Sequence, residues 1–352
     1  MIPLYKPYMP AVPKLDEILH SGQLAAGRYT REFEVCLKKY LGTERVAVVN
    51  SFNSAISVVI TTLGLEHGDE VILSPMACLA STQPYAGEGM KIVWADIDPR
   101  TGTMNPESVR AKITPKTKAI VHNHYCGYPG YIAEINQIGR EHGITVIDDG
   151  IECFGTCYKD QLIGNCGTDV TVFSFNPVRM LTTIDGGAIA FKDQKLYEKS
   201  LLVRDCGIDR KKFRDNLGEI SPNCDITMQG YSATLSNVNA YVGVCQFEGL
   251  DRRMELYQKN AAHWDALLTA ESGCTPLKSA NGTPNYWVYG MLSMDKQAAI
   301  RKFREMGYYA SGVHINNNID SVFGKAETLP GVQAFMDSFV ALPCGWWMED
   351  TV

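Results

Sequence analysis

Three polar turns, each directly after an apolar run, carry the residues of this chain that could do chemistry. The first, VVNSFNSA, offers Ser51, Asn53 and Ser54, whose hydroxyl and amide groups would lie at the N-terminus of a following helix. Such a terminus binds anions through its free N–H groups, although Ser51 or Asn53 could equally be an ordinary helix cap. The turn therefore predicts either a phosphate site or a capped helix.

The second turn follows the apolar run ITVI and contains Asp148, Asp149 and, three residues on, Glu152. A carboxylate at this place could hold a cationic ring nitrogen, ligate a metal or cap the next segment. A metal would need further histidine or carboxylate ligands, and the spacing of the seven histidines suggests no such set. We therefore expect no metal site.

The third turn, FSFNPVRMLTTIDGG, is the most specific of the three. It groups hydroxyl and amide donors ahead of a glycine pair that allows close backbone approach: Ser174, Asn176, Thr182, Thr183 and Gly186–Gly187. Together the three turns supply a phosphate cradle, a carboxylate and an anchoring loop. These are the groups that pyridoxal phosphate requires.

Arg179 stands where an anchoring loop of this kind would carry a reactive lysine. An arginine, which stays protonated at physiological pH, neither condenses with an aldehyde nor accepts a substrate proton. Its guanidinium can instead hold a phosphate or a carboxylate. Proton transfer would then fall to another group, and Glu152 is the nearest by sequence.

The elements that must position these turns alternate strictly between short β-branched runs and helical segments. Strands are expected at residues 45–50, 70–75, 91–97, 118–124, 143–149, 170–175 and 187–191. This alternation predicts an α/β fold with a mostly parallel central sheet flanked by helices on both faces. Ligands bind such sheets at the carboxyl ends of the strands, which is where the polar turns lie.

The rest of the chain predicts a smaller α/β domain, with a large domain over residues 1–250 and the small one over 251–352. A long helix is expected over 236–258, with Arg252 and Arg253 solvated. Strands are expected at 286–292 and 308–315, and a helix at 296–307. The polar segment 207–225 is long enough to be a functional loop.

Composition excludes several classes of protein. A net charge of −6 and a pI near 5.7 leave no basic stripe for nucleic acid. No apolar run of membrane-spanning length and no signal-like N-terminus occurs, so we expect a cytoplasmic protein without a membrane partner. The eleven cysteines include no CxxC pair, which favours reduced thiols over zinc ligands.

The order and spacing of these motifs resemble the DegT/DnrJ-type sugar aminotransferases, the fold type I pyridoxal-phosphate enzymes of nucleotide-sugar biosynthesis. The resemblance covers nearly the whole chain. Its landmarks run through IPLYKPYMP, SGQLAAGRYTREFE, VVNSFNSA, HGDEVILSP, VWADIDPRTGTMNPESV, ITPKTKAIVHNHYCGYP, VIDDGIECFG, FSFNPVRMLTTIDGGAI, GYSATLSNVNAYVG, YWVYG, VHINNN and LPCGWW. It implies a fold type I aminotransferase-like fold, a nucleotide-sugar substrate and a homodimer with active sites between subunits.

The resemblance also implies roles for individual residues. Asp149 would hold the ring nitrogen of the cofactor, and Glu152 would lie at its phenolic oxygen, where the family usually has glutamine. The cofactor phosphate would lie at Phe52, Asn53, Ser174 and Asn176. Cys78 aligns with the aromatic residue that stacks on the ring, Ser232 with an asparagine from the partner subunit, and Arg179 with the aldimine lysine.

On the substrate side, His314 and Asn316 match the family region that approaches the sugar. A histidine at a strand edge with only a structural role fits the same sequence equally well.

Three functions are compatible with these residues. The first is an aminotransferase-like enzyme acting on a nucleotide-linked keto-sugar, with pyridoxal or pyridoxamine phosphate held non-covalently. The second is a dehydratase that uses the amine form of the cofactor, but the family example carries histidine at the lysine position, which counts against arginine. The third is a non-catalytic relative that binds a sugar nucleotide. The sugar, the nucleotide and the amino donor are not determined by the sequence.

Overall fold

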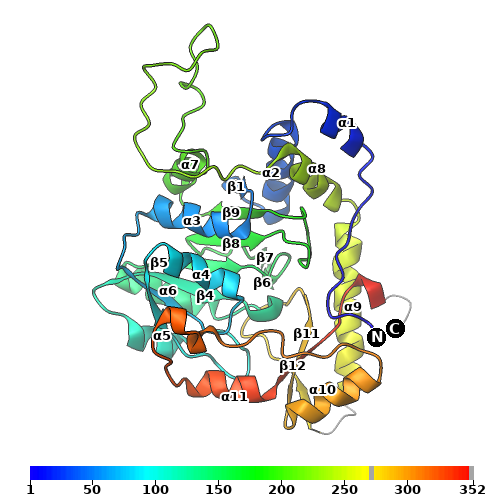
Figure 1. Ribbon diagram of the computed structural model, residues 1–352. Helices are drawn as coiled ribbons and strands as arrows, with labels where there is room; N and C mark the ends of the chain where they lie inside the picture. The colour runs from blue at the N-terminus through cyan, green and yellow to red at the C-terminus, as the bar shows by residue number, and fades with distance from the viewer. Residues whose placement is uncertain (269–272, 349–352) are drawn as a thin grey trace.

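A seven-stranded sheet forms the centre of the computed structural model, which describes residues 1–268 and 273–348 (Figure 1). Its strand order is β1-β9-β8-β5-β4-β2-β3. The strands are β1 (Val46–Val49), β2 (Glu70–Leu73), β3 (Lys91–Trp94), β4 (Thr117–Asn123), β5 (Thr145–Gly150), β8 (Val170–Ser174) and β9 (Gly187–Phe191). Only β9 runs antiparallel to its neighbours. The seven expected strands and the mostly parallel sheet are confirmed.

Helices cover both faces of this sheet. They are α1 (Leu15–His20), α2 (Arg28–Leu41), α3 (Phe52–Leu63), α4 (Leu79–Gly87), α5 (Pro106–Lys112), α6 (Ile132–His142), α7 (Gln194–Val203) and α8 (Asn237–Gln246). Successive strand residues point to opposite faces. Val146 therefore packs in the smaller core under α5 and α6, whereas Ile147 packs in the larger core on the other face. By the same alternation, Asp148 and Asp149 point to opposite sides of β5.

A second sheet of three antiparallel strands lies in the C-terminal part of the chain, and α9 runs beside it (Figure 1). It consists of β10 (Cys274–Pro276), β11 (Tyr289–Ser293) and β12 (Phe339–Leu342), with α9 (Leu250–Leu268), α10 (Lys296–Glu305) and α11 (Pro330–Ser338). The short elements are β6 (Cys157–Tyr158), β7 (Gln161–Leu162) and the 3₁₀ turns Tyr125–Gly127, Asn317–Ile319, Ser321–Phe323 and Trp346–Met348. The domain boundary at residue 250 stays a prediction.

The helix expected over 236–258 is two helices. The chain turns between α8 and α9 at Gly249, whose φ of +67° suits glycine. Arg253 is buried rather than solvated, with its guanidinium 4.0 Å from the centre of the Tyr8 ring. It also donates to the carbonyl oxygen of Glu248 at 2.9 Å. The aromatic ring and the carbonyl compensate the buried cation, and sequence periodicity reveals neither.

The strand expected over 308–315 is also absent from the fold. Only isolated bridges form there, from Tyr308 to Ile2 and from Ser311 to Ala341. Val313 has a φ of +61°, which no extended strand tolerates. The expected helix at 296–307 and strand at 286–292 are confirmed as α10 and β11.

The segment between α7 and α8 projects away from the sheets as a long loop (Figure 1). Its apolar side chains Leu217 and Ile220 are 87% and 62% exposed. Among the helices that the structure describes, none combines the length and apolarity needed to cross a bilayer.

Candidate functional site

A cavity of about 630 Å³ lies at the carboxyl ends of the central strands, the edge where the sequence places its polar turns. The turns after β1, β2 and β5 and the end of β8 supply part of its wall. It brings together seven residues that sequence reasoning selected: Phe52, Asn53, Cys78, Ser174, Asn176, Arg179 and His314. Residues far apart in the chain thus converge on one site of ordinary ligand-binding size.

The N-terminus of α3 forms the anion-binding end of the cavity. Ser51 caps the helix, because its Oγ accepts the N–H of Ser54 at 3.0 Å. The first N–H groups of a helix have no acceptor within the helix, so those of Phe52 and Asn53 are available to a ligand. The Phe52 side chain is 6% exposed and packs into the core, so it leaves this end open. Ser174 adds a hydroxyl at the end of β8.

Asp149 ends the buried part of β5, and its Oδ1 accepts the N–H of Ile151 at 3.1 Å. Burial, reinforced by the charge of Glu152, raises the pKa of Asp149 to about 6. No ion pair compensates this carboxylate within residues 1–268 and 273–348. A buried acid with a raised pKa and no cationic partner is suited to a ligand that brings a cation.

Glu152 is the centre of the polar network beside the cavity. Its Oε2 accepts the N–H of Cys126 at 2.8 Å. Its Oε1 accepts from Nε2 of His314 at 2.9 Å and from Nη1 of Arg179 at 3.4 Å. Burial acts to raise the pKa of Glu152, but the charges of His314 and Arg179 with these hydrogen bonds outweigh it. The pKa therefore lies below its ordinary value, and Glu152 is a carboxylate at neutral pH.

Arg179 is held against the cavity wall by an aromatic ring. Its side chain is 7% exposed, and its guanidinium lies 4.8 Å from the centre of the Trp287 ring. Trp287 donates Nε1–H to the carbonyl of Val178 at 2.6 Å and stacks on Tyr5 at 4.6 Å. The buried Nε of Arg179 has no acceptor among the described residues. Such an orphaned donor fits a phosphate or carboxylate of a ligand.

Four selected residues are not among those that line the cavity: Asp149 and Glu152, which are buried, and Ser232 and Asn316. Ser232 is exposed, and its carbonyl accepts from Nδ2 of Asn50 at 3.2 Å. Asn316 donates to the side chain of Asn318 at 2.6 Å. Sequence reasoning missed Tyr5 and Trp287, because nothing in their local sequence marks them as part of a site.

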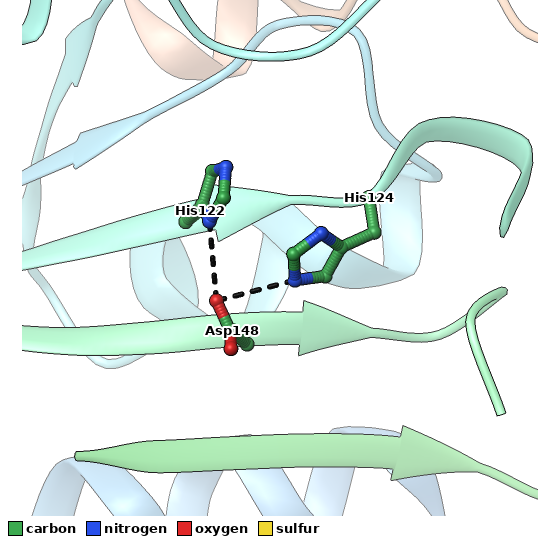
Figure 2. Close-up of side chains that lie close together, drawn as sticks. All are labelled: His122, His124 and Asp148. Carbon is green, nitrogen blue, oxygen red and sulfur yellow. Dashed lines mark hydrogen bonds and ion pairs between the residues drawn. The ribbon is translucent and has the colours of Figure 1, made fainter. Parts of the chain in front are cut away.

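A buried cluster on the other face of the sheet joins His122 and His124 of β4 and its C-terminal end to Asp148 of β5 (Figure 2). Nδ1 of His122 lies 3.1 Å, and Nε2 of His124 3.2 Å, from Oδ1 of Asp148. The sequence analysis found no histidines at a metal-binding spacing and therefore did not identify the group of His122, His124 and Asp148. Alternation puts residues 122 and 124 on one face, and the strand register pairs His122 with Asp148.

The hydrogen bonding of His124 does not fit a metal. Its Nδ1 accepts the N–H of Gly130 at 3.1 Å, so the proton of the neutral ring is on Nε2. A metal on Nε2 would require the proton on Nδ1, where the N–H of Gly130 already points. The two imidazoles instead hold the pKa of Asp148 below its usual range, although burial acts to raise it. The cluster is a buried His–Asp–His group in which His122 hydrogen-bonds Asp148 and His124 approaches the same carboxylate oxygen.

The fold, with its cavity at the strand ends, is that of a sugar aminotransferase. The model of the DegT/DnrJ/EryC1/StrS aminotransferase family matches residues 11–351, and the chain belongs to this family. The family expected from the sequence motifs is therefore confirmed.

Individual relatives agree with this assignment. The chain is 27% identical over 352 residues to the spore coat polysaccharide biosynthesis protein SpsC of Bacillus subtilis (strain 168), covering 96% of this chain and 90% of that protein. The structure of the sugar aminotransferase CalS13 from Micromonospora echinospora is similar with a TM-score of 0.92 and 29% identity, over 99% of this chain and 96% of that one. GDP-4-keto-6-deoxy-D-mannose-3-dehydratase from E coli, with bound hydrated PLP, has a TM-score of 0.86 over 98% of this chain and 95% of that one. At 18% identity this last likeness shows the fold alone.

Proposed function

We propose that this chain is an aminotransferase-like enzyme that acts on a nucleotide-linked keto-sugar in amino- or deoxy-sugar biosynthesis, with pyridoxal or pyridoxamine phosphate held non-covalently. The observation that carries the proposal is the cavity itself. Its wall contains the free N-terminus of α3 and Ile151, whose N–H donates to the buried Asp149, and none of its lining residues is a lysine. The family and the sugar aminotransferase CalS13 support the reaction class.

The residues present fit the cofactor at both of its ends. The N–H groups of Phe52 and Asn53, with the hydroxyl of Ser174, would hold its phosphate. Asp149 would hold its ring nitrogen, whose positive charge compensates the carboxylate. When bound, the cofactor supplies the electron sink on which amino-group transfer depends. Cys78 at the cavity wall gives the ring a smaller contact than an aromatic residue would.

Substrate binding would use the donors that the cofactor leaves free. Arg179, with its orphaned Nε, would bind a phosphate or a carboxylate. His314 lines the cavity beside it and would face the sugar, with Asn316 farther out. The role of SpsC in polysaccharide biosynthesis supports a sugar substrate.

The alternatives fit these residues less well. The family's dehydratase example carries histidine at the aldimine-lysine position, and the permanently protonated Arg179 cannot act as that base. A purely binding relative would have no need of the uncompensated Asp149, whose burial as an anion is costly.

We propose a homodimer whose subunits complete one another's sites. Ser232, which aligns with a residue contributed by the partner, is exposed, and the projecting loop shows Leu217 and Ile220 to solvent. Exposed apolar side chains of this kind mark contact surfaces. Sedimentation at micromolar concentration should give twice the chain mass, whereas a monomer would contradict the proposal. A cytoplasmic location stays a prediction from the sequence.

The cofactor state of the purified protein tests the proposed function. Added pyridoxal phosphate should bind and change the visible absorption spectrum, and dialysis should remove it. Borohydride before dialysis should leave no reduced cofactor on the chain in intact-mass spectra, because no lysine lies between Lys159 and Lys192. Product analysis with keto-sugar nucleotides would then separate amino transfer from dehydration. Protein that binds no cofactor at all would contradict the proposal.

A further inference from the structure

His314 enters the cavity with its ring orientation fixed by a buried carboxylate. Its Nε2 lies 2.9 Å from Oε1 of Glu152, whose side chain is 3% exposed. Because Glu152 is ionised it can only accept, so Nε2 of His314 carries the proton. Nε2 keeps this proton in both charge states of the ring; the charged ring also carries a proton on Nδ1, whereas the neutral ring has a free lone pair there. The side chain is 20% exposed and lines the cavity, and Nδ1 has no hydrogen-bond partner in residues 1–268 and 273–348.

The backbone before His314 is strained in a way that supports a functional role. Val313 has a φ of +61°, a left-handed conformation that a β-branched residue rarely adopts, and Val313 also lines the cavity. Its N–H donates to Oγ of Ser311 at 3.1 Å, and the N–H of His314 donates to the carbonyl of Gly312 at 2.8 Å. Strain of this kind persists where the surrounding structure enforces it, and it gathers at functional sites.

We propose that Nδ1 of His314 is the proton-transfer base of the cavity, oriented by Glu152, in place of the lysine amine that position 179 lacks. This inference rests on the proposed function. Arg179 is excluded as a base by its permanent charge. Glu152 is a poorer choice than His314, because both of its oxygens already accept hydrogen bonds. His314 is thus the catalytic residue and Glu152 the residue that positions it.

In the proposed step, the ring of His314 removes one proton from the donor and later gives it back, so the ring is unchanged at the end. Nδ1 would take the proton from the carbon that bears the amino group of the donor, and the cofactor, when bound, would supply the electron sink for the pair of that C–H bond. The imidazolium that forms is stabilised by the carboxylate of Glu152. The imidazolium then gives this proton to the carbon that must be protonated for amino-group transfer to finish. The ring of His314 is thereby neutral again.

The first test uses the cofactor-free protein. Nitrogen-15 NMR of the histidine rings, with the His314 signals assigned from their loss in His314→Asn, should show the proton on Nε2. In Glu152→Gln this preference should weaken, since an amide both donates and accepts. In the neutral ring of the unmodified protein, a proton on Nδ1 with none on Nε2 would overturn the proposal whether or not the protein binds cofactor.

The second test uses protein loaded with pyridoxal phosphate in D₂O, with L-glutamate and L-glutamine as probes. The unmodified protein should exchange the α-proton of a donor, and His314→Asn should slow this by about a hundredfold or more while retaining cofactor. Adding Arg179→Lys to His314→Asn should restore exchange, because a lysine amine is again present. The exposed His20 provides the matched control, and His20→Asn should change nothing.

The outcomes separate the two proposals. Two outcomes overturn the role of His314 and leave the cofactor site intact. In the first, cofactor binds and the unmodified and His314→Asn proteins exchange the proton equally. In the second, cofactor binds but the unmodified protein shows no exchange. Failure to bind cofactor overturns the proposed function, and the NMR result then decides the His314–Glu152 arrangement by itself.

Discussion

Arg179→Lys should convert a cofactor site that releases its ligand into one that binds pyridoxal phosphate covalently. The substitution places a primary amine beside Trp287 and Glu152, where the guanidinium now lies. An amine with its pKa lowered by burial condenses with the aldehyde. Cofactor remaining after dialysis should rise by roughly tenfold or more. A protonated Schiff base should absorb near the visible edge, and borohydride should fix the cofactor to residue 179 in peptide mass spectra.

Arg179→Met is the matched control for this experiment. Methionine fills similar space along the Trp287 ring but offers no amine, so it should give neither the absorption nor the covalent adduct. If the unmodified protein is trapped by borohydride at another lysine, position 179 is not the counterpart of the aldimine lysine, and the expected alignment is wrong.

Asp149→Asn should weaken cofactor binding and, at the same time, stabilise the cofactor-free protein. The pKa of Asp149 is raised from 3.8 to about 6. Between about pH 4 and 6 the folded protein therefore binds more protons than the unfolded one, and its stability falls as the pH rises through this window. Above about pH 6 the folded protein bears the full free-energy cost of burying the ionised Asp149, about 3 kcal/mol. The variant should remove this cost, so its melting temperature should exceed that of the parent at pH 7.5 but not at pH 4.

Cofactor affinity should show the opposite effect of the same substitution. Without the carboxylate, the cationic ring nitrogen loses its buried partner, and Kd should rise by roughly a hundredfold, about 3 kcal/mol. In the parent, affinity should fall as the pH drops below about 6, because Asp149 becomes protonated, and the variant should lose this dependence. Spectroscopic titration between pH 5 and 8 measures both effects.

The exposed Asp160 supplies the control, and Asp160→Asn should leave stability and affinity unchanged. Equal cofactor affinity in the Asp149→Asn variant and the parent would show that the carboxylate does not contact the ring.

The sequence predicts the central sheet well because each strand is a local apolar run bounded by a polar turn. Where a strand ends, its polar residues meet those of its neighbours, so the position of the site follows from the same pattern. The strand expected at 308–315 fails because its periodicity does not reveal the left-handed backbone of Val313. Arg253 was expected to be solvated because its compensating ring, Tyr8, is remote in the chain.

The electrostatics of the site depend on distant contacts that local sequence does not contain. The His–Asp–His group exists because the register of β4 and β5 pairs His122 with Asp148. Similarly, Glu152 alone suggests a base, but its contacts with His314 and Arg179 lower its pKa and occupy one of its oxygens. The chemistry proposed for each residue therefore changes once its partners are known.

The stacking of Tyr5 on Trp287 has a consequence for the order in which the chain can fold as it is synthesised. Tyr5 is made among the first residues, whereas Trp287 is made only after the whole central sheet. During synthesis the N-terminal segment is therefore made long before its partner, and the aromatic contact beside Arg179 forms only after the central sheet is complete. A nascent chain stalled before residue 287 should have the sheet and the α3 anion site, yet release its cofactor.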